Sequence, residues 1–217
     1  ADVIEPLKPL VLFLENKGYQ AVICDSSDGD RSVLPLKLAA VRAGLGWQGK
    51  HSLLISKKFG TFLALGGIIT NALLEHNTRQ EANHCGNCDK CQKACPVNAL
   101  DRSYKLTRGK CLSYLMQVEH LSEEAPDAMA NRVADCEICQ DVCPWNRKHI
   151  AQPLATKLTV TFQKKIRDWE RFFYLPDLVK MSEQEYIQST DKLRAGIPYD
   201  LFRRNVRIAL RNAAKGG

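Results

Sequence analysis

Eight of the nine cysteines in this 217-residue chain fall into two groups with the spacing of iron-sulfur cluster ligands. The first group follows C-x2-C-x2-C-x3-C-P, a pattern whose short loops wrap several thiolates around one cubane cluster. Its members are Cys85, Cys88, Cys91 and Cys95. The second group repeats the x2 and x3 spacings and the terminal Cys-Pro, and consists of Cys111, Cys136, Cys139 and Cys143. Two clusters and a role in electron transfer are therefore predicted.

The ligands of each cluster follow from the position of the Cys-Pro pairs, because in two-cluster ferredoxins this cysteine ligates the other cluster. We assign one 4Fe-4S centre to Cys85, Cys88, Cys91 and Cys143, and the other to Cys111, Cys136, Cys139 and Cys95. Structural zinc fits less well, because zinc sites usually pair C-x2-4-C halves or add histidines. Disulfides fit less well too, because the chain shows no secretory signal and we expect a reducing compartment. Cys24 is left over and is predicted to be a buried structural thiol.

Composition sets wider limits on the function. The chain is 45% hydrophobic and 25% charged, as is usual for soluble globular proteins. No apolar run approaches the roughly 18 residues of a membrane span, so no membrane partner is expected. We further expect a cytoplasmic location and a monomer. The formal net charge is +7, which two oxidised clusters of about −2 each reduce to about +3. That balance permits a nucleic-acid partner without requiring one. Because the chain begins at Ala1, we expect an N-terminal portion to be missing.

Hydrophobic periodicity divides the chain into three regions with an α+β fold class. Residues 1–76 are predicted to form an α/β domain, residues 77–150 the cluster domain, and residues 151–217 a helical region. Within the α/β domain we expect helices near 4–14 and 36–43, and strands near 19–24, 52–55 and 62–70. In the helical region, Ser182-Glu-Gln-Glu185 is a capping box that starts one helix, and Pro198 precedes another.

A glycine-rich stretch from Gly44 to Ser52, Gly-Leu-Gly-Trp-Gln-Gly-Lys-His-Ser, lies inside the predicted α/β domain. It matches G-x-G-x-x-G, but a dinucleotide fingerprint follows a strand and opens a helix, whereas here a predicted helix precedes and a strand follows. It also approaches a P-loop, but His51 stands where magnesium binding needs Ser or Thr. Its glycines still allow backbone amides to approach a large ligand. The alternative is a tight turn with Trp47 packed in the core.

Taken together, the glycine stretch, both cysteine groups and several further segments resemble the cobalamin-dependent epoxyqueuosine reductases. The further segments are Lys110–Leu115, Cys143–Asn146, Phe202–Asn205 and Leu210–Ala213. The resemblance spans nearly the whole chain and implies a corrinoid-binding α/β domain, a bacterial-type two-cluster ferredoxin domain and a HEAT-like helical segment. It implies reduction of epoxyqueuosine to queuosine at the wobble position of a transfer-RNA anticodon stem-loop. Electrons would come from an external donor such as flavodoxin or ferredoxin.

The resemblance also implies roles for individual residues. The cobalamin-binding set is Gly44, Leu45, Gly46, Trp47, Gly49, Lys50, Ser52, Tyr114 and Trp145. The family's proton donor is an aspartate directly after a strand, which matches Asp25. This chain lacks the Pro and Glu-Arg that follow it in the family, so Asp28 and Asp30 are alternatives, and a row of Asp, Ser and Gly is also typical of an ordinary turn.

The C-terminal helix carries the implied RNA-binding residues, Arg203, Arg204, Arg207 and Arg211. Such a stripe could bind phosphates, although a solvated helix face is the alternative. No histidine lies in a corrinoid-binding motif, so no histidine ligand to cobalt is expected. Two other functions stay open: a corrinoid-dependent reductase of a small molecule, similar to the reductive dehalogenases, and an electron carrier without corrinoid.

Overall fold

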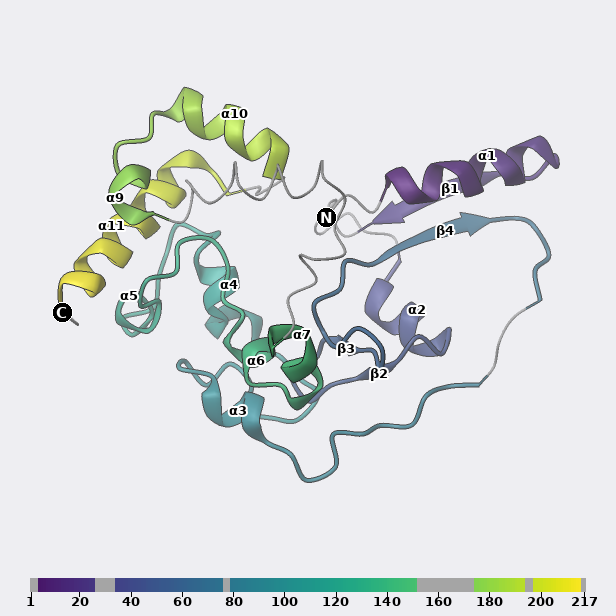
Figure 1. The fold of residues 1–217 in the computed structure, drawn as a ribbon, viewed down its shortest axis with the longest axis horizontal. Helices are drawn as coiled ribbons and strands as arrows, with labels where there is room; N and C mark the ends of the chain where they lie inside the picture. The colour runs from purple at the N-terminus through teal and green to yellow at the C-terminus, as the bar shows by residue number, and fades with distance from the viewer. Residues whose placement is uncertain (1–3, 26–33, 76–78, 152–173, 194–196, 216–217) are drawn as a thin grey trace. The chain divides into compact units, whose positions relative to one another are not determined.

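The structure, a computed structural model, describes residues 4–25, 34–75, 79–151, 174–193 and 197–215 (Figure 1). The chain forms two compact units. The N-terminal unit comprises residues 1–88 and 144–146, and the C-terminal unit comprises residues 89–143 and 147–217. The cluster domain predicted for residues 77–150 is thus divided between the two units, while most of it shares one unit with the helical region. Asp28 and Asp30 lie outside the described residues.

The N-terminal unit combines short helices with two small antiparallel sheets (Figure 1). Its helical elements are η1 (Glu5–Leu7), α1 (Lys8–Asn16), α2 (Leu36–Arg42) and η4 (Pro144–Asn146). One sheet pairs β1 (Ala21–Asp25) with β4 (Gly66–Thr70), and α1 packs beside β1. The other pairs β2 (Trp47–Gln48) with β3 (Leu54–Ile55). The helices and strands expected from periodicity are confirmed, with ends shifted by a few residues.

The C-terminal unit contains mostly short helices. They are α3 (Lys90–Ala94), η3 (Arg108–Lys110), α4 (Leu112–Leu115), α5 (Ala125–Ala128), α6 (Ile138–Asp141), α7 (Arg147–Ala151), α9 (Leu175–Leu178), α10 (Glu183–Leu193) and α11 (Tyr199–Lys215). Helices of four or five residues are not stable on their own in water. The loops and helices that carry the cysteines therefore depend on tertiary contacts.

Two apolar cores hold the C-terminal unit together. The first core is formed by Val97, Ala99, Leu112, Leu115, Met116, Ala125 and Met129. The second core is formed by Leu178, Tyr186, Ile197, Phe202 and Val206. Helix α11 contributes to both, because Phe202 and Val206 belong to the second core while Ile208 packs against the first. This shared helix explains why the cysteine region and the helical region form one unit.

Local sequence signals set the starts of the last two helices. The predicted capping box is confirmed: the Glu185 amide donates to Ser182 Oγ over 3.3 Å, and the Ser182 amide donates to Glu185 Oε2 over 2.8 Å. Helix α11 starts at Tyr199, directly after Pro198. Within the described stretches of the chain, no helix has both the length and the apolar character needed to cross a bilayer.

Candidate functional site

The glycine stretch begins in the turn that ends α2. Gly44 has φ 75°, a left-handed conformation that costs a glycine least. Its amide donates to the Val41 carbonyl and the Leu45 amide donates to the Ala40 carbonyl, each over 3.0 Å. This pair of bonds is a Schellman motif, which satisfies the last carbonyls of a helix. Gly44 therefore turns the chain from α2 into β2.

The next residues form a tight hairpin. A Cβ atom at Gly46 would lie 2.0 Å from the Ile55 carbonyl oxygen, so only glycine lets β2 and β3 approach this closely. The Gly49 amide donates to the Leu53 carbonyl, and the Ser52 amide donates to the Gly49 carbonyl, each over 2.8 Å. Ser52 has φ 66°, which is strained for a residue with a side chain. The stretch runs from helix to strand, as expected, which is the reverse order to a dinucleotide-binding loop.

Two buried ring nitrogens in this hairpin have no hydrogen-bond partner within the described residues: Trp47 Nε1 and His51 Nε2. Trp47 is 2% exposed and His51 is 3% exposed. The Leu53 amide donates to His51 Nδ1 over 3.2 Å, so the proton of a neutral ring lies on Nε2. Burial, with a smaller contribution from the charge of Lys37, lowers the pKa of His51 to about 4. Both nitrogens are therefore desolvated donors, each costing roughly 1–3 kcal/mol unless an acceptor binds.

A pocket of about 290 Å³ lies beside the hairpin. It is lined by Pro35, Leu36, Lys37, Leu38, Val41, Gln48, Ser52 and Leu54. An apolar lining with a few polar groups is typical of sites for small molecules and cofactors. Of the residues predicted to bind a cofactor, Ser52 lines this pocket. The volume suits one apolar group, or a portion of a larger ligand.

The glycine stretch contacts the loop that carries the first two cysteines. Lys50 Nζ donates to the Gly86 carbonyl over 2.7 Å, and Gly86 lies between Cys85 and Cys88. Asn83 Nδ2 donates to the Gln48 carbonyl over 3.1 Å, while its Oδ1 accepts from the Cys85 amide over 2.9 Å. The structure thus brings a predicted cofactor segment and two predicted cluster ligands side by side within the N-terminal unit.

Aromatic rings fill the space next to this contact. Trp47 meets Trp145 edge to face at 4.7 Å between ring centroids, and meets His84 in the same way at 4.8 Å. The next residue, Asn146, is fully buried. Its Oδ1 accepts from the Thr61 amide and its Nδ2 donates to Thr61 Oγ1, each over 2.7 Å. These bonds fix the residues after Cys143, so that Trp145 stays against Trp47.

In the C-terminal unit, the structure brings together the four cysteines that were assigned to the second cluster. Cys95, Cys111 and Cys136 pack against the first apolar core. Burial, followed by the charges of the neighbouring Cys136, Cys111, Cys91 and Cys95, raises the pKa of Cys139 to about 12. Buried thiolates this close repel one another, and a positively charged metal core relieves that repulsion. The donor set therefore fits an iron-sulfur cluster.

A site for a single metal ion differs from a cluster site, because its ligands converge on one point. Across the described residues, no three His, Cys, Asp or Glu side chains converge on one point where an ion could bind. In a cubane, each thiolate binds a different iron atom. Cys24, the ninth cysteine, is buried, as predicted.

Three other predicted site residues lie in three different parts of the fold. Leu45 is 61% exposed. Tyr114 lies in the C-terminal unit, where the Arg108 guanidinium sits 4.6 Å from the centroid of its ring. Asp25 is the last residue of β1 and pairs with Gly66, so it stands directly before residues 26–33.

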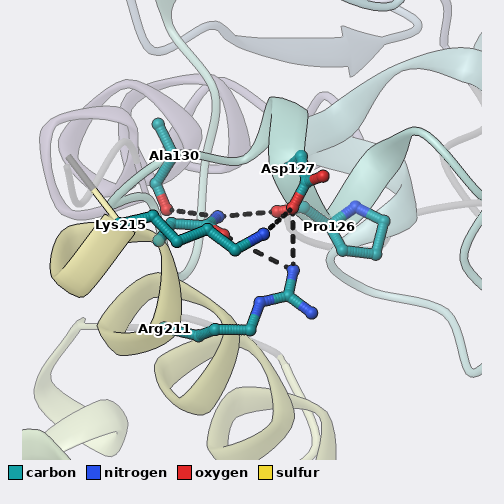
Figure 2. A network of polar contacts seen from close by, with 6 residues as sticks. Pro126, Asp127, Ala130, Arg211 and Lys215 are labelled. Atoms are coloured by element: carbon teal, nitrogen blue, oxygen red, sulfur yellow. Dashed lines mark hydrogen bonds and ion pairs between the residues drawn. The ribbon is translucent and has the colours of Figure 1, made fainter.

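Two of the predicted RNA-binding arginines make internal contacts. Arg211 Nη2 lies 3.0 Å from Asp127 Oδ1, and Lys215 Nζ lies 3.3 Å from the same oxygen (Figure 2). Asn212 Nδ2 donates to the Pro126 carbonyl over 2.7 Å and to the Ala130 carbonyl over 3.0 Å. Arg211 and its neighbour thus fasten α11 to α5.

Arg204, two helical turns before Arg211, is the second arginine with internal contacts. Its guanidinium donates to the carbonyls of Leu115, Met116, Val118 and Glu119. Asn205 Nδ2 donates to the Met116 and Val133 carbonyls, each over 2.9 Å. Arg207 is exposed, and Arg203 lies over the Tyr199 ring at 5.6 Å. The asparagines were not predicted, although the repeated Arg-Asn dipeptide was a visible signal.

Comparisons with known proteins identify relatives of this chain. Residues 84–146 match the family model of a 4Fe-4S double cluster binding domain, so this region of the chain is an iron-sulfur cluster domain. The chain is 34% identical over 185 residues to an epoxyqueuosine reductase from Pseudomonas aeruginosa, which covers 82% of this chain and 48% of that protein. The chain spans less than half the length of the curated relatives that it matches.

Solved structures show the same similarity. One is a crystal structure of epoxyqueuosine reductase with an epoxyqueuosine-modified tRNA-Tyr stem loop. Its TM-score is 0.76 and its sequence is 25% identical to this chain. The match covers 97% of this chain and 54% of the chain in that structure. Another, from Bacillus subtilis, has its catalytic aspartate loop swung out of the active site, with a TM-score of 0.75 and 25% identity over the same shares of the two chains.

Proposed function

We propose that this chain, which belongs to the epoxyqueuosine reductase family and spans about half the length of its members, is a cobalamin- and iron-sulfur-dependent reductase that converts epoxyqueuosine to queuosine in transfer RNA. One observation supports this most directly. The glycine stretch, the candidate cofactor segment, is hydrogen-bonded to the loop that carries Cys85 and Cys88. An electron that reaches a cluster on that loop would have a short path to a cofactor beside it.

The residues present fit a corrinoid in two respects. Trp47 Nε1 and His51 Nε2 are buried donors without acceptors among the described residues, and the amide side chains at the rim of a corrin ring offer carbonyl acceptors. The pocket lined by Lys37, Gln48 and Ser52 can take a portion of such a ligand. When bound, cobalamin supplies a low-valent cobalt centre that is strongly reducing. The chain's role is to hold it, exclude water and deliver electrons.

Reduction of an epoxide also needs a proton, because opening the ring leaves an alkoxide-like oxygen. We propose Asp25 as its source, at the end of β1 and at the start of the segment 26–33. A relative of known structure has a catalytic loop named for an aspartate that swings out of its active site. Asp28 and Asp30 are the alternatives in this chain.

The proposed substrate is the anticodon stem-loop, since one solved neighbour holds an epoxyqueuosine-modified tRNA stem loop. On α11, Arg207 is exposed and Arg203 lies beside it, so these two guanidinium groups are the candidates for phosphate contacts. Arg204 and Arg211 would act by fixing α11. Electrons would come from an external donor such as flavodoxin or ferredoxin.

The test is anaerobic reconstitution with iron, sulfide and cobalamin, followed by a metal count and an assay on epoxyqueuosine transfer RNA. We expect about eight iron atoms for two 4Fe-4S clusters, about one cobalt per chain, and formation of queuosine. Asp25→Asn should abolish turnover while the metal count stays the same. Iron without cobalt would contradict the corrinoid proposal and favour an electron carrier. Cobalt binding with no reaction on the RNA would favour a small-molecule substrate.

A further inference from the structure

We propose that Lys50 raises the reduction potential of the 4Fe-4S cluster ligated by Cys85 and Cys88, acting as a positioning residue through the Gly86 carbonyl. Lys50 belongs to the stretch predicted to bind cobalamin, yet its ammonium group donates to Gly86 O over 2.7 Å. The contact joins a cation to the backbone of the cluster loop. This role holds whatever the final electron acceptor is.

The peptide group that Lys50 contacts lies inside the C-x2-C loop. Its carbonyl belongs to Gly86 and its N–H belongs to Asn87, and both residues lie between Cys85 and Cys88. A hydrogen bond to the carbonyl of a peptide polarises the group and makes its N–H a stronger donor. Hydrogen bonds toward the sulfur atoms are among the factors that set the potential of a cluster. Lys50 can therefore act through this peptide without touching the cluster.

The charge of Lys50 acts in the same direction. Reduction adds one electron to the cluster and no proton, so the cluster becomes more negative. A cation nearby stabilises the reduced form more than the oxidised form, which raises the potential. Lys50 makes no ion pair with a carboxylate among the described residues. Glu81, which lies four residues before Cys85, is paired with Lys57 at 2.6 Å and with His84 at 2.9 Å.

The surrounding backbone holds Lys50 in place. The hairpin bonds from Gly49 to Leu53 and from Ser52 to Gly49 fix the residues on either side of it. The bond from Asn83 to the Gln48 carbonyl gives the hairpin and the cysteine loop a second point of contact. The backbone of Lys50 is therefore fixed beside the cysteine loop, which keeps its ammonium group within reach of the Gly86 carbonyl.

The experiment is an EPR-monitored potentiometric titration of the reconstituted protein without cobalamin. Three variants are compared with the wild type: Lys50→Gln, which removes the charge, Lys50→Arg, which keeps it, and Lys17→Gln, which removes the same charge at the exposed end of α1. We expect Lys50→Gln to lower the potential of one cluster and leave the other unchanged. The shift should be on the order of a tenfold smaller reduced-to-oxidised ratio at a fixed potential, about 59 mV for one electron. Lys50→Arg should restore the potential.

Three outcomes would overturn the proposal: potentials equal to the wild type in Lys50→Gln, an equal shift of both clusters, or the same shift in Lys17→Gln. Loss of about four iron atoms in Lys50→Gln would point to a structural role. Lys50→Met, which keeps the apolar stem, is then measured, and loss of iron in both variants also overturns it. Because no corrinoid or RNA is present, the result is independent of the proposed function.

Discussion

Cys139 illustrates how single residues carry the chemistry of this chain. It is surrounded by four other cysteines, and burial together with their proximity raises its pKa to about 12. A thiol in these surroundings is a poor nucleophile when free, because the thiolate is the reactive form. Iron bound to it would keep it deprotonated. Its placement therefore suits a permanent metal ligand better than a redox-active thiol.

Replacing Cys139 should remove one cluster. For Cys139→Ala we expect about four iron atoms per chain after reconstitution, against about eight in the wild type, as measured by iron analysis and EPR. Cys24→Ala is the matched control, because Cys24 is buried but belongs to neither cysteine group, and it should keep the full count. An unchanged iron content in Cys139→Ala would refute the ligand assignment.

His51 should make stability depend on pH. In the folded protein its pKa is lowered from 6.5 to about 4, so the unfolded state binds more protons between these values. The free energy of unfolding should rise as pH rises from about 4 to 6.5, and this contribution is lost as pH falls through that window. The full shift corresponds to about 3 kcal/mol.

Denaturant titrations at about pH 5 and pH 7.5 measure this dependence. Between the two pH values, His51→Gln should show a smaller difference in the free energy of unfolding than His120→Gln, an exposed control. Equal differences would contradict this.

At the scale of single elements, helix α11 connects the short helices of the C-terminal unit. Its two Arg-Asn dipeptides donate to carbonyls at and after the ends of α4 and α5, where helices leave backbone acceptors unsatisfied. The same helix buries Phe202 and Val206 in the second core. Helix α11 therefore acts as a clamp on the short helices around the second cysteine group.

Removing one of these contacts should weaken the C-terminal unit. For Asn205→Ala we expect a loss of about 1–3 kcal/mol in the free energy of unfolding, because this buried side chain donates to the carbonyls of Met116 and Val133. Arg207→Ala, at an exposed position of the same helix, should stay within about 0.5 kcal/mol of the wild type. Urea unfolding followed by circular dichroism separates the two results, and equal losses would contradict the clamp.

RNA-binding measurements should distinguish the roles of two arginines on α11. Arg207→Gln should weaken binding to an anticodon stem-loop and reduce the slope of log K against log salt by about 0.7–0.9, with little change in stability. Arg204→Gln should destabilise the protein instead, because its guanidinium is bonded to four carbonyls. Filter binding at several salt concentrations, alongside urea unfolding, checks both. A salt slope unchanged in Arg207→Gln would leave that arginine on a solvated face.

At the scale of the whole molecule, the clusters should contribute to folding as well as to electron transfer. The helices next to the cysteines, α3 and α6, have five and four residues, too few to be stable alone. Thiolates that bind metal only in the folded state convert metal affinity into stability. Removing iron with a chelator should therefore lower the melting temperature, reduce helical circular dichroism and expose thiols to titration. Removing cobalamin from the reconstituted protein should leave thiol exposure unchanged.

The amount that could be predicted differs between regions of the chain. The strand ending at Asp25, helix α2 and the capping box at Ser182 follow from local patterns, and the structure has them. The pairing of β1 with β4 joins segments more than 40 residues apart, which periodicity cannot reveal. Arg204 and Arg211 share one face by helical spacing, but which surface that face contacts depends on α4 and α5.

By itself, the sequence determined the cluster chemistry, because cysteine type and spacing decide which metal centre a short loop can hold. It also determined the order of helix, glycine stretch and strand, which disfavours a dinucleotide-binding loop, and the presence of His51, which disfavours a P-loop. Only the tertiary structure decided that Lys50 binds the cysteine loop, that His51 is a buried neutral ring, and that Arg204 bonds to backbone carbonyls while Arg211 pairs with Asp127. The reason is physical: burial and charge pairing depend on contacts with residues that are distant in the chain, and local sequence patterns do not identify those residues.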